Sequence, residues 1–120
     1  MELSDPAAAL PESLRSRATI LAGEYAWRPV DVEAVIEAFR DLGVAVLGLE
    51  VWLPEGASPR VLGCTEYEVP FMRPWAAYVD ENARLALTEF KRRSVPTNAV
   101  FNLTYISEWD GGVIRKRQRK

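Results

Sequence analysis

The amino-acid sequence predicts an α+β fold, in which two to three helices pack on one face of a small, mostly antiparallel sheet of three to four strands. Apolar residues recur at helical spacing in two long segments and alternate, as they do in strands, in three others. Clusters of glycine and proline separate these segments and indicate turns between them. Because 120 residues is the size of one domain, we expect a single α+β domain over residues 1–114, followed by a basic tail at 115–120.

Three segments are expected to be helical. The clearest is Pro29–Gly43, because proline suits the first turn of a helix and glycine suits its end. The longest is Trp75–Arg93, which stops before Pro96. A third helix is predicted over Pro11–Ala22, with Gly23 ending it. The side chains that should face the core from the first two helices are Val32, Val35, Ile36, Phe39, Leu42, Trp75, Tyr78, Val79, Asn82, Leu85, Ala86 and Phe90.

The first strand is predicted at Val44–Leu53, because every odd position is apolar and should face the core. The even positions are mixed and include Glu50 and Trp52, so the opposite face of the sheet should be only partly covered. After a turn rich in proline, Arg60–Val69 is expected to return as an antiparallel strand. The remaining strands are expected at Asn98–Ser107 and, after a tight turn, at Val113–Ile114.

The register of the second strand decides which side chains share the outer face of the sheet. We favour the register in which the core-facing side chains are Val61, Thr65, Tyr67 and Val69. A shift by one residue would bury Glu66 and Glu68 without partners, at a cost of roughly several kcal/mol. In this register, the residues that share the outer face of the sheet are Glu50, Trp52, Cys64, Glu66 and Glu68.

The sequence contains no histidine and one cysteine, Cys64. This excludes histidine-based catalytic triads, histidine metal ligands, intramolecular disulfides and CxxC zinc sites. A lone thiol without a histidine base is typical of a buried structural residue, which is what we expect of Cys64. The remaining carboxylates, arginines and hydroxyls fit a binding protein better than an enzyme, so we expect no catalytic residue, no metal and no cofactor.

The net charge of −2 is distributed unevenly along the chain. The last six residues carry +5, and removing them from −2 leaves −7 over residues 1–114. An acidic body repels nucleic acid and attracts basic proteins, so we expect a basic protein partner, although the tail could contact phosphate. Because the sequence has neither a run of about 18 apolar residues nor a Sec signal, we expect a cytoplasmic protein that does not bind membranes.

The outer face of the predicted sheet is the first candidate for a partner-binding site. Carboxylates beside an aromatic anchor are typical of a docking surface for a basic protein. Two other interpretations stay open, namely an ordinary solvated face and a divalent-cation or acid/base site, although no metal-site spacing supports the latter. Trp27 and Trp75 are expected in the core, whereas a tryptophan near a strand end is a better binding candidate. The candidate residues are Glu50, Trp52, Glu66, Glu68 and Trp109.

One block of the sequence resembles the immunity protein 40 family of bacterial polymorphic toxin systems. An amphipathic helix ends at Asp41-Leu42-Gly43 and is followed by Val44-Ala45-Val46-Leu47-Gly48-Leu49-Glu50-Val51-Trp52. Trp27 precedes this helix, and a later helix follows around Tyr78 to Phe90, so the resemblance covers about half of the chain. It implies a small α+β cytoplasmic protein that binds and neutralises one cognate toxin domain. By position, Glu50 and Trp52 correspond to the acidic and aromatic residues of the family's motif.

These observations lead to one principal hypothesis and two alternatives. The principal hypothesis is a non-enzymatic, immunity-type protein that binds a basic toxin domain through an acidic surface. The first alternative is a small-molecule-binding or carboxylate-based enzyme domain, with a pocket on the outer sheet face lined by Glu50, Cys64 and Asn102. The second is a nucleic-acid-associated regulator that uses the basic tail. An exposed edge strand could also pair two copies of the chain as a homodimer.

Overall fold

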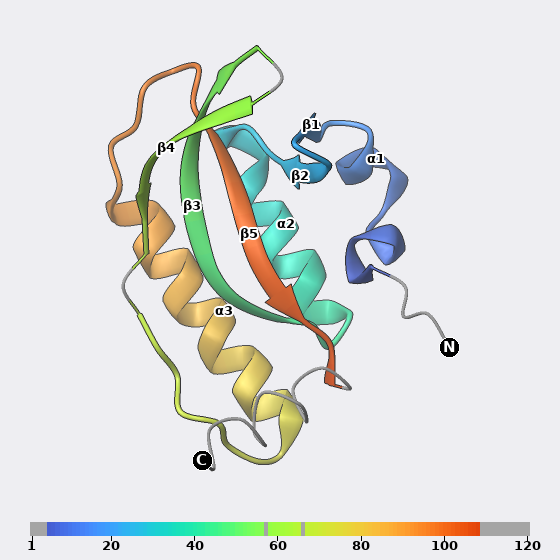
Figure 1. Cartoon of the computed structure of the whole chain (residues 1–120). Helices are drawn as coiled ribbons and strands as arrows, with labels where there is room; N and C mark the ends of the chain where they lie inside the picture. The colour runs from blue at the N-terminus through green and yellow to red at the C-terminus, as the bar shows by residue number, and fades with distance from the viewer. Residues whose placement is uncertain (1–4, 57, 66, 109–120) are drawn as a thin grey trace.

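Two long helices cover one face of a three-stranded antiparallel sheet in the computed structural model of the chain, which describes residues 5–56, 58–65 and 67–108 (Figure 1). The central strand is β3 (Ala45–Glu55), flanked by β4 (Ser58–Cys64) and β5 (Val100–Ile106). The helices are α2 (Pro29–Asp41) and α3 (Trp75–Arg92). This arrangement confirms the predicted α+β class. The predicted strand at 113–114 and the basic tail lie outside the described residues.

Both long helices lie where their periodicity placed them. α2 begins at Pro29, and Gly43 follows its end with a positive φ of 73°, a conformation that glycine adopts without strain. The Trp75 indole N–H donates to the Gly43 carbonyl at 2.7 Å, which joins the start of α3 to the end of α2. The residues that the helices bury are Asp31, Val32, Val35, Ile36, Phe39, Tyr78, Val79, Asn82, Ala83 and Ala86.

Trp27 stands at the centre of the core, as the sequence predicts. Its side chain is fully buried and meets Phe39 edge-on, with ring centroids 6.5 Å apart. Its backbone N–H and C=O both pair with Phe101 of β5, at 2.9 and 2.7 Å. Its indole N–H donates to the Leu14 carbonyl at 2.9 Å. One residue therefore connects the N-terminal segment, α2 and β5.

Two irregularities in β3 change the predicted alternation of its side chains. The register with β5 shifts between Val46 and Gly48, and as a result Val46 is fully buried although it occupies an even position. The register with β4 shifts between Val51 and Trp52, which places Val61 opposite Trp52. Val61 is 53% exposed, so its predicted place in the core is wrong. An extra residue in one strand reverses which face the following side chains occupy.

β4 ends earlier than the predicted strand Arg60–Val69, but the segment after it still follows β3. The Thr65 N–H donates to the Leu49 carbonyl at 2.9 Å, while the Thr65 hydroxyl accepts from the Leu49 N–H at 3.0 Å. The Tyr67 hydroxyl donates to the Val46 carbonyl at 2.7 Å, and Val69 is buried. The predicted core-facing orientation of Tyr67 and Val69 is therefore confirmed without a continuous ladder.

The predicted helix over Pro11–Ala22 is wrong. Its second half contains the β-branched residues Thr19 and Ile20, which favour a strand. Ala22 and Gly23 both have positive φ, 52° and 77°, which is the requirement of a two-residue hairpin turn. The N-terminal elements are the 3₁₀ helix η1 (Pro6–Ala9), α1 (Glu12–Arg15), β1 (Thr19–Leu21) and β2 (Glu24–Ala26).

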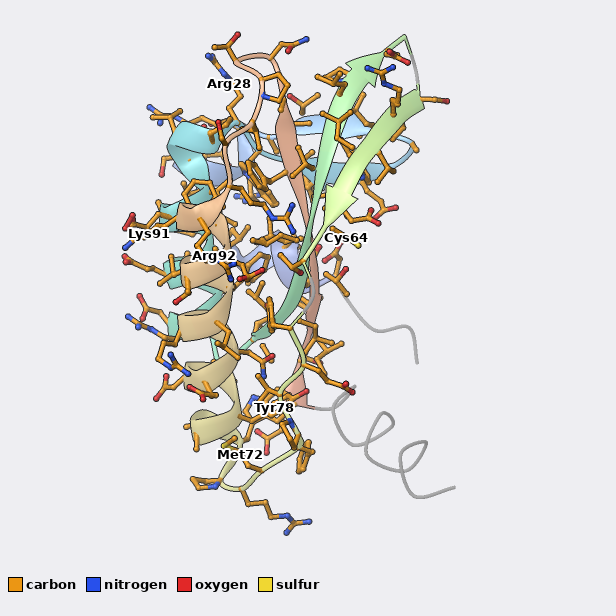
Figure 2. All side chains as sticks on the ribbon, turned by 90° about the vertical axis from the view of Figure 1, so that its left-hand side faces the viewer. Arg28, Cys64, Met72, Tyr78, Lys91 and Arg92 are labelled. Atoms are coloured by element: carbon orange, nitrogen blue, oxygen red, sulfur yellow. The ribbon has the colours of Figure 1, made fainter. Side chains whose placement is uncertain are left out.

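The β1–β2 hairpin lies beside β5 and reaches the side of the sheet opposite the helices (Figures 1 and 2). β2 meets β5 through the isolated bridge between Trp27 and Phe101, immediately after the last residue of β2. On the side away from the helices, the hairpin residues Leu21 and Ala26 pack against Trp52 and Val100. The hairpin therefore covers one end of the sheet's second face, and among the described residues no helix covers the rest.

Ala22 is the one described non-glycine residue with a positive φ, so replacing it tests the hairpin turn. An L-residue other than asparagine or aspartate is strained in this region by about 1 kcal/mol. We expect Ala22→Asn to raise the free energy of unfolding by about that amount, measured by urea denaturation. Ala22→Val, with a branched side chain in the same conformation, should lower it. Equal stability of the two variants would contradict the assigned turn.

Candidate functional site

The face of the sheet opposite α2 and α3 contains Glu50, Trp52 and Cys64, three of the residues that the sequence predicts there. We call it the helix-free face. Residues directly opposite each other on antiparallel strands point to the same side of a sheet. Cys64 lies at the end of β4 on the side away from α3 (Figure 2). The cross-strand rows on this face are Cys64–Glu50–Asn102 and Val61–Trp52–Val100.

Glu50 and Trp52 share this face, as predicted, and bond to each other. The Trp52 indole N–H donates to a Glu50 carboxylate oxygen at 3.0 Å. Trp52 is only 4% exposed, so the expectation of an exposed aromatic anchor at this position is wrong. The reason is the β1–β2 hairpin, whose Leu21 covers the indole. The indole N–H of Trp52 therefore holds the carboxylate of the half-buried Glu50 in one orientation.

Cys64 is exposed, and the expectation of a buried structural thiol is therefore wrong. Its position explains the exposure, because it ends the edge strand β4 and faces away from the helices. The guanidinium of Arg93, which follows α3, donates a hydrogen bond to the backbone carbonyl of Cys64. The predicted place of Cys64 on the same face as Glu50 is confirmed, because the two residues lie directly opposite each other.

The other predicted site residues are not gathered at Glu50 by the described contacts. Glu68 is exposed. Burial raises the pKa of Tyr78 of α3, and the Glu68 carboxylate adds to that rise. Glu66 and Trp109 lie outside the described residues. Over the part of the chain that the structure describes, no group of three or more carboxylate or thiol side chains could hold a metal ion. Over the same part, no helix is long and apolar enough to cross a membrane.

A cleft of about 230 Å³ lies between the β1–β2 hairpin and β5, next to the helix-free face. It forms because β2 and β5 separate beyond the single Trp27–Phe101 bridge. We call it the β2–β5 cleft. Asn102 connects it to the predicted site, because this residue lies opposite Glu50 and also lines the cleft. The lining residues are Asp5, Gly23, Glu24, Tyr25, Asn102, Leu103, Thr104 and Tyr105.

Hydrogen bonds hold the polar groups of the cleft in place. The buried Asn102 amide donates to the Tyr25 carbonyl at 2.9 Å and, more weakly, to a Glu24 carboxylate oxygen at 3.4 Å. The Tyr105 hydroxyl donates to Asp5 at 2.7 Å. Burial raises the pKa of Tyr105 well above its ordinary value of 10, and Asp5, Tyr25 and Glu24 raise it further. Because its lining contains Asp5 and Glu24 and no lysine or arginine, the cleft is a region of negative potential.

A second hollow, of about 290 Å³, lies between β4 and the segment that follows α3. Arg93 is its one charged lining residue, and the other walls include the apolar side chains Val51, Leu62 and Val95. The Arg93 Nε is buried and finds no hydrogen-bond partner among the described groups.

Comparisons with known proteins found no matching family model, no matching curated protein and no matching solved structure. The resemblance to the immunity protein 40 family therefore stays a prediction from the sequence.

The sequence analysis missed Asp5, Glu24 and Tyr25, because it assigned the neighbouring segment to a helix. One signal could have found the last two. Ala22-Gly23 follows three residues rich in β-branched side chains, and a two-residue loop ending in glycine between such segments is typical of a hairpin. Nothing in the sequence alone places Asp5 near Tyr105, which is a contact across nearly the whole chain.

The negative potential of the cleft predicts how Tyr105 titrates. A folded-state pKa above the unfolded value means that the stability from this group is complete below about pH 10 and is lost as pH rises through the raised pKa. Asp5→Asn keeps a hydrogen-bond acceptor but removes a charge, so we expect it to lower the pKa of Tyr105. Ultraviolet titration of phenolate, with Tyr105→Phe subtracted, measures the shift. Glu37→Gln on the exposed side of α2 is the control, and an equal shift there would refute the local effect.

Proposed function

We propose that the chain is a non-enzymatic, immunity-type protein of the cytoplasm, which binds a basic toxin domain through the helix-free face and the β2–β5 cleft. The class of partner comes from the sequence resemblance and from the acidic body. The location of the binding surface comes from the distribution of unpaired carboxylates.

The observation that carries the proposal is a group of carboxylates at the helix-free face and the β2–β5 cleft that have no cationic partner among the described residues. On α3, Glu81 and Glu89 each pair with an arginine three residues along the helix, at 2.6 and 2.7 Å. Within the described residues, no lysine or arginine forms an ion pair with Asp5, Glu24 or Glu50. Carboxylates without cations leave the negative field on that side uncompensated, which attracts a positively charged surface.

Electrostatic attraction of this kind acts mainly on the rate of association. The residence time of a complex depends on well-packed contacts near its centre. On the helix-free face the exposed Cys64 lies directly opposite Glu50, and the exposed Val61 lies in the neighbouring row. These two side chains provide a small apolar contact area beside the charge. The surface therefore combines a charged part with an apolar part.

A small-molecule-binding domain is the second candidate, because the β2–β5 cleft is a hollow with several polar groups. The pocket expected for that alternative was lined by Glu50, Cys64 and Asn102. Of these three residues, only Asn102 lines the cleft. A metabolite that raises the melting temperature of the protein in the absence of any partner would favour this candidate over the principal one.

The proposal is tested with the full chain in its own bacterium. A tagged copy should retain a basic protein in stoichiometric amount, and the purified pair should dissociate in high salt. Expression of that partner alone should stop bacterial growth, and co-expression of the chain should restore it. A partner whose expression does not affect growth would refute the immunity function.

Reversal of charge at Glu50 tests the binding surface. We expect Glu50→Lys to slow association with the basic partner by about tenfold or more at low ionic strength, because attraction becomes repulsion. The difference should shrink at about 1 M salt, where charges are screened within roughly 3 Å. Stopped-flow or surface-binding kinetics measure the rate. Glu37→Lys changes the net charge equally on α2, and an equal slowing by both variants would assign the effect to net charge rather than to this face.

A further inference from the structure

The size of the β2–β5 cleft limits what it can hold. Its volume of about 230 Å³ is below the roughly 300–1,000 Å³ that is typical of sites for whole small-molecule ligands. It is nevertheless several times the roughly 30 Å³ that one water molecule occupies in the liquid. The cleft therefore suits the end of a long side chain better than a complete metabolite.

The walls of the cleft combine two exposed carboxylates with two fixed aromatic rings. Glu24 comes from the hairpin and Asp5 from the segment before η1, so they approach the cleft from separate elements. The Tyr25 ring stacks on Trp27 at 5.8 Å, and the Tyr105 ring stacks on Phe39 at 4.4 Å. Because both rings rest on buried core residues, little conformational entropy is lost when a ligand contacts them.

Carboxylates beside aromatic faces favour an organic cation. A guanidinium or ammonium group gains attraction from a ring face and charge-assisted hydrogen bonds from carboxylates. A calcium ion would take six to eight oxygen ligands, whereas the cleft supplies two carboxylates. The two carboxylates, with no lysine or arginine among the residues that line the cleft, favour a positive charge placed between these groups.

We propose that the β2–β5 cleft is a receptor for one arginine or lysine side chain of the basic partner. Glu24 and Asp5 accept hydrogen bonds from the cation, and the Tyr25 and Tyr105 rings contact its apolar stem. Asn102 is a positioning residue, because its amide holds the Glu24 carboxylate and the Tyr25 backbone together. This inference rests on the proposed function, since it assigns one contact of the same binding surface.

The experiment titrates the isotope-labelled full chain with N-acetyl-arginine amide and, separately, with N-acetyl-citrulline amide, its neutral isostere. Backbone amide shifts report where each compound binds. We expect the arginine compound to shift Gly23, Glu24 and Thr104, and the citrulline compound to bind at least about tenfold more weakly, a difference of about 1.4 kcal/mol. Equal shifts from both compounds, or shifts centred elsewhere, would overturn the proposal.

Glu24→Gln is the diagnostic variant, because Glu24 is exposed at a hairpin turn and its replacement leaves the core untouched. We expect it to weaken binding of the arginine compound about tenfold, while the matched control Glu37→Gln leaves binding unchanged. If Glu24→Gln alters the amide spectrum throughout the protein, Asp5→Asn replaces it as the test. Unchanged affinity in a folded Glu24→Gln protein would overturn the assignment.

The outcome also separates this inference from the proposed function. A basic partner that binds wild-type and Glu24→Gln protein equally would refute the cation receptor and leave the immunity function standing. Specific binding of the arginine compound without any basic protein partner would support the receptor and refute the immunity function. If neither a basic protein partner nor specific binding of the arginine compound is found, the cation receptor and the immunity function are both refuted.

Discussion

The double hydrogen bond between the backbones of Trp27 and Phe101 is the constraint on which the rest of the structure depends. It attaches a short N-terminal hairpin to a sheet that would otherwise end at β5. The buried indole of Trp27 then fixes the distance between this junction and α2, because it packs against Phe39. A bridge of one residue pair is enough to attach the hairpin, but it does not continue as a ladder, and β2 and β5 separate beyond it. The cleft is thus a consequence of how the core is closed.

The position of the hairpin also decides the character of the second face of the sheet. The hairpin covers the apolar ring of Trp52, and the indole N–H still donates a hydrogen bond to the Glu50 carboxylate. The exposed part of the face then consists mainly of polar and charged groups, with Val61 at its border. A sheet with both faces fully covered would be more stable through apolar burial but would have no comparable surface to present. Within the described residues, both long helices lie on one face of the sheet and only the hairpin covers part of the other.

The sequence predicts the parts of this fold whose signals repeat. α2 and α3 extend over several turns, so their apolar periodicity is reinforced at each turn. β3 has apolar side chains at alternate positions, which identified Glu50 and Trp52 as residues of one face. The register shifts at Val46 and Val51 each depend on one extra residue, and no sequence pattern marks them. The cleft could not be predicted, since it needs a three-residue hairpin strand and the distant Asp5 to meet at β5.

The Arg93 guanidinium on the Cys64 carbonyl has a consequence for how copies of this chain behave at high concentration. An uncovered edge strand is a template on which another chain can add a strand and extend the sheet. Along β4, Pro59 has no N–H to donate, and Arg93 already occupies the carbonyl of Cys64. A chain arriving at this edge would have to displace the guanidinium and would still find the hydrogen-bond ladder interrupted. At the other edge of the sheet, the Trp27–Phe101 bridge already occupies one position of β5.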